Sequence, residues 1–243
     1  MRDYALLASV IVAFGAPALL ARGWWTLHSV ESHIRFLDVV IGPAALGLVA
    51  GRGITLMIDD RRALLRLSDV LVIRSGVEFW PALAAAAGLA AWNARRDGVR
   101  PSVRLAELAP LAMVGYATYE ASCVWRDGCF GPESPIGLYP EGITTRMLPI
   151  GILVGASVVV AASVLRRVAF RVSPPALLLG AVGSVAGFRA VASFWLPYLG
   201  DGLTRQHRTS IAIASAATVA LGVMELVRLS RRRSLRVAVE VRR

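Results

Sequence analysis

The sequence contains no lysine, only two cysteines and three histidines, and several long segments without any charged residue. Two cysteines, Cys123 and Cys129, are too few for a disulfide scaffold or a zinc cluster. The histidines lie outside the apolar segments and no pair has helical metal spacing, so we expect no metal site. Walker, dinucleotide-binding and nucleophile-elbow motifs are also missing, and we expect no cofactor. The absence of lysine is most simply a product of GC-rich coding and carries no functional argument.

Apolar segments dominate what is present. Hydrophobic residues make up 56% of the 243 residues, and residues 4–21, 148–165 and 210–224 carry no charge. Each is close to the roughly 20 helical residues needed to cross a bilayer. We therefore predict an all-α polytopic membrane protein with about seven transmembrane helices. The expected spans are residues 4–21, 36–51, 77–92, 108–125, 148–165, 174–196 and 210–226. Residues 1–226 would form a single transmembrane domain, followed by a basic cytoplasmic tail at 227–243.

The net charge of +11 is carried by arginines that flank these spans. In a membrane protein such charge suits anionic lipid headgroups, so we expect a membrane partner and no nucleic acid. Arginines are more frequent on the side that holds residues 95–104, 166–171 and the tail. The positive-inside rule then places the N-terminus outside and the C-terminus in the cytoplasm. Residues 52–74, which include DDRRALLRLSD, carry arginines on the outer side; we interpret them as an amphipathic helix on the outer interface.

Two arginines lie where a cation is costly. Arg189 falls inside the sixth expected span, where an ionisable side chain usually marks an ion or substrate site. The alternative is a structural ion pair with Asp38, Glu78 or Glu120. Arg126 ends the fourth span before a loop rich in glycine and proline. Its guanidinium, with backbone N–H groups of that loop, could bind a phosphodiester; it could equally be a snorkelling interfacial arginine.

The remaining candidates are weaker. Arg52 ends the second expected span between two glycines, a place where arginines are common. Cys123 and Cys129 could form a disulfide on the outer face or stay free, and we favour two buried small apolar side chains.

With these residues in view, the chain resembles the bacterial prolipoprotein diacylglyceryl transferases, seven-span enzymes of the cytoplasmic membrane. The similarity runs from about residue 47 to 226 and includes VAGRGI, RDGCFGPESPIG, GFRAVASF and LTRQHRTSIAIAS. The resemblance implies transfer of a diacylglyceryl group from phosphatidylglycerol to the lipobox cysteine thiol of a prolipoprotein, with release of glycerol 1-phosphate. It implies phosphatidylglycerol and prolipoprotein signal peptides as partners. It also implies that Arg126, with Arg52 and Gly128, binds the lipid phosphate and that Arg189 is catalytic.

The chain departs from the family pattern at its histidines. Trp80, Pro81 and Ala82 stand in place of the His-Gly-Gly motif, and residues 143–149 keep almost nothing of the His-Pro-x-Gln-Leu-Tyr-Glu motif. A thiol acceptor needs a base to become a thiolate. We therefore expect Glu133, in the same loop as Arg126, or Glu78 to serve as the catalytic base, unless the field of the two arginines lowers the pKa of the thiol directly.

Two classes of function stay open at this point. The first is a diacylglyceryl transferase, and the second is a non-catalytic phospholipid-binding membrane protein of the same fold. A small transporter is a third and weaker interpretation, because the sequence shows no repeat symmetry.

Overall fold

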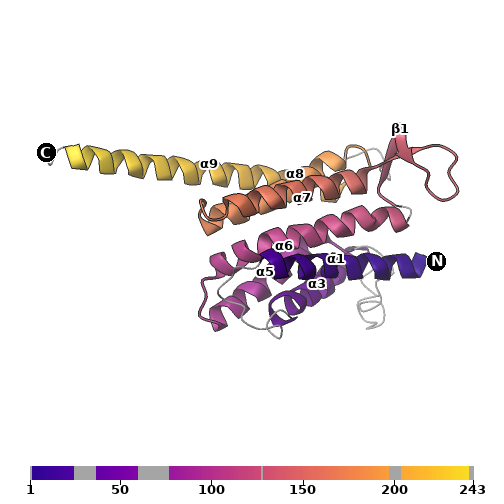
Figure 1. Cartoon of the computed structure of the whole chain (residues 1–243), viewed down its shortest axis with the longest axis horizontal. Helices are drawn as coiled ribbons and strands as arrows, with labels where there is room; N and C mark the ends of the chain where they lie inside the picture. Colours follow the sequence, from indigo (N-terminus) through magenta and orange to yellow (C-terminus); the bar gives the residue numbers. More distant parts are fainter. Residues whose placement is uncertain (1, 25–36, 60–76, 127, 197–203, 241–243) are drawn as a thin grey trace. The chain divides into compact units, whose positions relative to one another are not determined.

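The computed structural model describes residues 2–24, 37–59, 77–126, 128–196 and 204–240 (Figure 1). This part of the chain is mostly helical. Its long helices are α1 (Arg2–Trp24), α3 (Gly42–Asp59), α5 (Phe79–Arg96), α6 (Pro101–Ala121), α7 (Ile150–Val168), α8 (Pro174–Ala192) and α9 (Arg205–Glu240). A turn of π-helix, η1 (Leu37–Ile41), precedes α3, and a 3-10 turn, η3 (Ser122–Arg126), follows α6. Two antiparallel strands, β1 (Phe130–Leu138) and β2 (Met147–Pro149), precede α7.

The chain forms two compact units, and the single transmembrane domain expected for residues 1–226 stays a prediction. One contains Met1–Trp25 and Leu108–Arg243, and the other contains Thr26–Glu107. The expected tail at 227–243 begins inside α9, which continues without a break to Glu240. A sequence of uniform apolar composition gives no signal for this division.

All seven expected spans contain a described helix. Four segments are long and apolar enough to cross a membrane: Val39–Ile58, Ile150–Val168, Pro174–Ala192 and Arg205–Ser230. The apolar part of α1, Ala8–Leu20, is shorter. In α6 the charged residues Arg104, Glu107 and Glu120 lower the hydropathy, and α5 is largely alanine and ends in two arginines. The structure therefore indicates a membrane protein, while the number of seven spans remains a prediction.

Helix α3 extends further than the sequence suggested. It continues eight residues past Gly51 to Asp59, so Arg52 lies inside the helix and is buried. The prediction that Arg52 ends a span is wrong. The expected interfacial helix at 52–74 begins inside α3, and its residues 60–76 lie outside the described residues.

Glycines allow close packing in both units. In α3, a methyl group on Gly47 would lie 2.7 Å from the carbonyl oxygen of Ala82 in α5. In α7, methyl groups on Gly151 and Gly155 would lie 2.5 and 2.6 Å from backbone oxygens of α6. Gly47 and Gly51 in α3, like Gly151 and Gly155 in α7, are four residues apart, the spacing that lets helix backbones approach closely in lipid.

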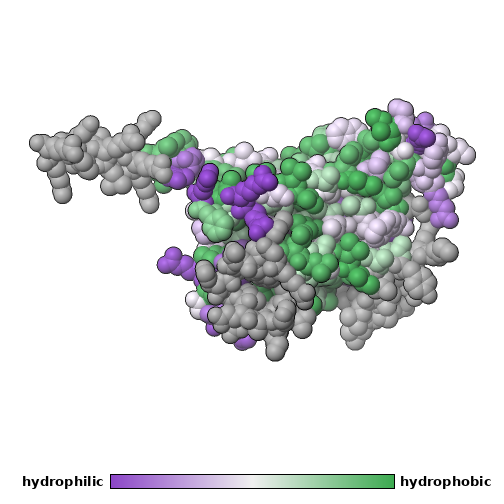
Figure 2. Space-filling model, viewed as in Figure 1, coloured by the Kyte–Doolittle hydropathy of each residue, from purple (hydrophilic) through white to green (hydrophobic). Residues whose placement is uncertain are grey.

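The outer surface of the helices is apolar. Figure 2 shows hydrophobic side chains along the face where α7 lies, and Leu153, Val160 and Val164 of this helix are each about half exposed or more. Val219, Val223 and Leu226 of α9 are exposed in the same way. Such continuous apolar surface fits contact with lipid and not with water.

Candidate functional site

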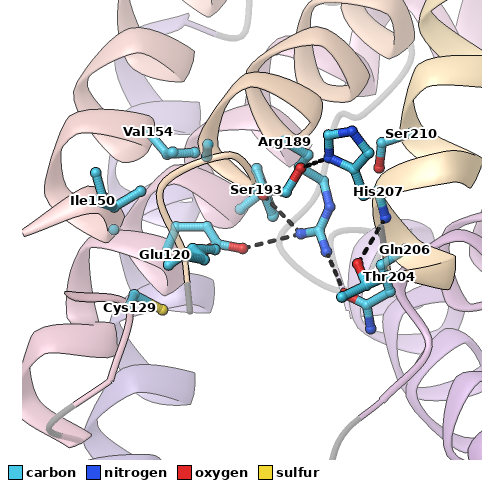
Figure 3. Close-up of a pocket in the computed structure, with 14 residues that line it drawn as sticks. Glu120, Cys129, Ile150, Val154, Arg189, Ser193, Thr204, Gln206, His207 and Ser210 are labelled. Carbon is cyan, nitrogen blue, oxygen red and sulfur yellow. Dashed lines mark hydrogen bonds and ion pairs between the residues drawn. The ribbon is translucent and has the colours of Figure 1, made fainter. Parts of the chain in front are cut away.

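A cavity of about 310 Å³ lies in the unit that contains Leu108–Arg243 (Figure 3). The C-terminal parts of α6 and α8 and the N-terminal parts of α7 and α9 contribute its walls. In an antiparallel arrangement these four helix ends belong to the same side. Residues that line the cavity include Tyr116, Glu120, Ile150, Arg189, Gln206 and His207.

Arg189 is held in the wall of this cavity by three neighbours. Its Nη1 donates to the hydroxyl of Tyr116 at 2.8 Å and to Oε1 of Glu120 at 3.1 Å. Its Nη2 donates to Oε1 of Gln206 at 3.2 Å, and the guanidinium also lies over the Tyr116 ring. Fixed donors of this kind suit an anion, because no further ordering is needed when it binds.

Glu120 is the ion-pair partner of Arg189, one of the three acidic residues that the sequence offered for this role. The two side chains are 17% and 18% exposed, so the pair is largely shielded but still borders the cavity. A bound phosphate would compete with the Glu120 carboxylate for the same guanidinium. The site thus has a cation whose charge is partly compensated before any ligand arrives.

Arg126 does not line this cavity. It ends η3, where its Nη1 donates to the hydroxyl of Tyr119 at 3.0 Å and its guanidinium lies 4.6 Å from the Tyr119 ring centre. Its Nε is buried and makes no hydrogen bond within the described part of the chain. Arg126 and Arg189 therefore contact different tyrosines of α6, and the structure does not bring both arginines to one cavity.

The cysteines form a disulfide, so the preference for free, buried thiols is wrong. Cys123 and Cys129 close a short loop around Arg126. Gly128 lies in this loop, and its N–H donates to the carbonyl of Cys123 at 3.1 Å instead of facing an open anion site. A side chain at Gly128 would come within 3.0 Å of the Cys123 sulfur. Cys129 also lines the cavity, which links the loop to the site.

The other sequence-predicted residues lie elsewhere. Glu133 is exposed on β1, opposite Met147 of β2, and does not line the cavity. Arg52 and Glu78 are buried in the second unit. There the N–H of Glu78 donates to the Gly51 carbonyl and to the Thr55 hydroxyl. These contacts belong to the junction of α3 and α5.

His207 is the functional candidate that the sequence analysis missed. It was placed before the last span, but α9 begins at Arg205, and His207 is 1% exposed in the cavity wall. Its Nδ1 contacts Oγ of Ser193, and its ring packs edge-to-face on Phe194. Only the structure reveals this face of α9, on which His207, Ser210 and Ala217 lie at helical spacing and are all buried.

No protein-family model matches the chain, and no curated protein matches it. The class of protein therefore follows from the fold and the cavity alone. Four described helices are apolar and long enough to span a membrane, and the cavity in one unit contains a fixed arginine.

Proposed function

We propose that this protein is a phospholipid-dependent transferase of the cytoplasmic membrane, similar to the prolipoprotein diacylglyceryl transferases. The observation that carries the proposal is Arg189, a guanidinium oriented by three polar side chains at the wall of a cavity among apolar helices. A cation at such a place is costly without an anionic ligand or partner. The proposed substrate is phosphatidylglycerol, whose phosphodiester supplies the anion and whose acyl chains would lie along the apolar helices.

The proposed topology is consistent with this use. With seven spans and the N-terminus outside, α6 and α8 end on the outer side, and α7 and α9 begin there. The cavity would then open at the outer half of a bacterial cytoplasmic membrane, with the basic C-terminus inside. The positive-inside bias of the arginines supports this orientation.

The proposed reaction is thiol transfer. A substrate cysteine thiolate attacks the carbon of the diacylglyceryl group that is bonded to the phosphate oxygen, so a C–S bond forms. The C–O bond to the phosphate breaks, and the electron pair leaves on the oxygen of glycerol 1-phosphate. Arg189 would stabilise this leaving group, and Tyr116 and Gln206 would hold the guanidinium in place. Arg126 lies outside this cavity, and we propose it only as a separate contact for a lipid phosphate at the end of η3, where its Nε makes no hydrogen bond among the described residues.

One observation favours the alternative function, a phospholipid-binding protein without transfer. The Glu120 carboxylate already pairs with Arg189 at 3.1 Å, as it would in a structural ion pair. Both functions require phosphatidylglycerol to bind at Arg189, so binding and transfer need to be measured separately.

The test is an assay of purified protein with labelled phosphatidylglycerol and a lipobox peptide. We expect transfer by the wild type and a loss of about 10²–10³ in rate for Arg189→Gln, the effect of removing one stabilising donor. Arg146→Gln is the matched control, since Arg146 is an exposed hairpin arginine that binds the Pro135 carbonyl.

Three outcomes decide the matter. Transfer by the wild type and its loss in Arg189→Gln support the transferase. Lipid binding that depends on Arg189 without any transfer supports the alternative. Neither binding nor transfer, or equal loss in Arg146→Gln, overturns the proposed site. Complementation of a strain depleted of its own transferase checks the first outcome in cells.

A further inference from the structure

His207 is a buried, titratable side chain in the cavity wall, and the reaction proposed above gives it no role. It is 1% exposed and lines the same cavity as Arg189. Its Nε2 is buried and makes no hydrogen bond within the described residues. A buried polar atom without a partner is uncommon and requires an explanation, such as a ligand or a catalytic role.

The imidazole is held by contacts at its other nitrogen, at its ring and at its main chain. Nδ1 contacts Oγ of Ser193, the residue that follows α8 (Figure 3). The main-chain N–H of His207 donates to Oγ1 of Thr204 at 3.2 Å, and Phe194 packs against the ring. These contacts define both the position of the imidazole and the direction of its ring.

The hydrogen bonds of Ser193 select the tautomer. Its hydroxyl has one hydrogen, and its Oγ lies 2.7 Å from the Ala190 carbonyl oxygen, which can only accept. The hydroxyl therefore donates to Ala190 and accepts from Nδ1–H of His207. Nε2 is then the nitrogen with the lone pair. In the opposite assignment the hydroxyl would donate to Nδ1, and its 2.7 Å contact with the Ala190 carbonyl would then join two acceptors.

We propose that His207 is the general base that removes the proton from the acceptor thiol, and that Ser193 is a positioning residue that holds its tautomer. This inference rests on the proposed function. The S–H bond breaks and its proton moves to Nε2, while the sulfur electron pair forms the new C–S bond. The C–O bond to phosphate breaks toward Arg189, and the proton later passes from Nε2 to the released phosphate monoester or to water.

Other carboxylates are less suited to this step. Glu120 lines the cavity, but its carboxylate is engaged by Arg189. Glu133, the base expected from the sequence, is exposed on β1 and outside the cavity. His207 is the cavity residue that combines a fixed tautomer with an unengaged lone pair.

The test compares His207→Asn with the wild type in the labelled-lipid assay. The asparagine amide can still donate to Ser193, but it has no basic nitrogen. We expect phosphatidylglycerol to co-purify as before and the transfer rate to fall by about 10²–10⁴, as on loss of a general base. Arg208→Gln, at an exposed neighbouring position of α9, is the control and should keep the wild-type rate.

Varying the acidity of the acceptor thiol distinguishes a general-base role of His207 from a structural role. An acceptor peptide with a more acidic thiol needs less help to ionise, so the deficit of His207→Asn should shrink with that acceptor. Ser193→Ala should show a smaller deficit of the same kind, and Ser193→Thr, which keeps the hydroxyl, should restore the rate. If His207→Asn does not fold, this serine pair decides the question.

The outcomes distinguish the two proposals. An active wild type with full activity in His207→Asn, or with unchanged activity in Ser193→Ala if the asparagine variant does not fold, overturns His207 as base and leaves the transferase intact. A deficit that is the same for both thiols assigns His207 a structural role and also overturns the inference. An inactive wild type overturns the transferase, and the role of His207 with it.

Discussion

Two arginine–carboxylate pairs, one in each unit, have nearly the same length and very different surroundings. Arg104 pairs with Asp97 at 3.2 Å, and Arg189 pairs with Glu120 at 3.1 Å. The side chain of Arg104 is 3% exposed and the side chain of Asp97 is 32% exposed. Arg189 instead borders a cavity and has two neutral hydrogen-bond partners in addition. The N–O distance of an ion pair therefore does not indicate whether the pair is structural or functional. The presence of a cavity next to the pair is the more informative observation.

The sharpest test of this comparison exchanges the two arginines for glutamine. Arg189→Gln should reduce transfer by the 10²–10³ given above, and it should also lower the free energy of unfolding, because the Glu120 carboxylate loses its partner. Arg104→Gln should lower the free energy of unfolding by about 1–2 kcal/mol, less than for a fully buried pair because Asp97 is partly exposed. Transfer per folded molecule should be unchanged in Arg104→Gln. Stability in mixed micelles and the lipid assay measure both effects, and a reversed pattern would contradict the comparison.

A second prediction concerns the packing that places Glu120 beside the cavity. A methyl group at Gly155 would lie 2.6 Å from the carbonyl oxygen of Ala117 in α6, so Gly155→Ala should force α6 and α7 apart. We expect a loss of about 1–3 kcal/mol in stability, the usual effect of overpacking. Gly222→Ala in α9 meets no atom within 4 Å and should be neutral or slightly stabilising. Equal effects in the two variants would show that close helix packing does not matter here.

The smallest expected effect comes from Glu120. If phosphate and the Glu120 carboxylate compete for Arg189, Glu120→Gln should increase the phosphatidylglycerol that co-purifies by about fivefold, equivalent to about 1 kcal/mol. The quantity to measure is lipid per protein after identical washing, with Arg146→Gln as control. A decrease would mean that Glu120 holds Arg189 in its binding orientation instead of competing with the lipid.

The sequence predicted the helices well and the site only in part. Uncharged segments of about 20 residues mark spans by composition alone, and all seven expected segments contain a helix. Arg189 stood out because a charge inside an apolar segment is unusual. Its partner could not be chosen among Asp38, Glu78 and Glu120, since the choice depends on which helices pack together.

The misplacement of Arg52 and the omission of His207 have a common cause, because both depend on which helix faces pack together. Arg52 was placed at a helix end because glycines flank it, but Gly51 lies where α3 packs against α5 and does not end the helix. His207 was overlooked because Arg205 and Arg208 beside it lower the local hydropathy. Composition averages over all faces of a helix, whereas His207 lies on the one face that is buried.

The length of α9 has a mechanical consequence. Its 36 residues correspond to about 54 Å of helix, whereas a hydrocarbon layer is about 30 Å thick. Even the apolar part, Arg205–Ser230, is longer than an upright span requires. In a bilayer, a helix of this length must tilt or project beyond the hydrocarbon layer. His207 is two residues from the start of α9, so any tilt of this helix would change the depth of the cavity in a bilayer.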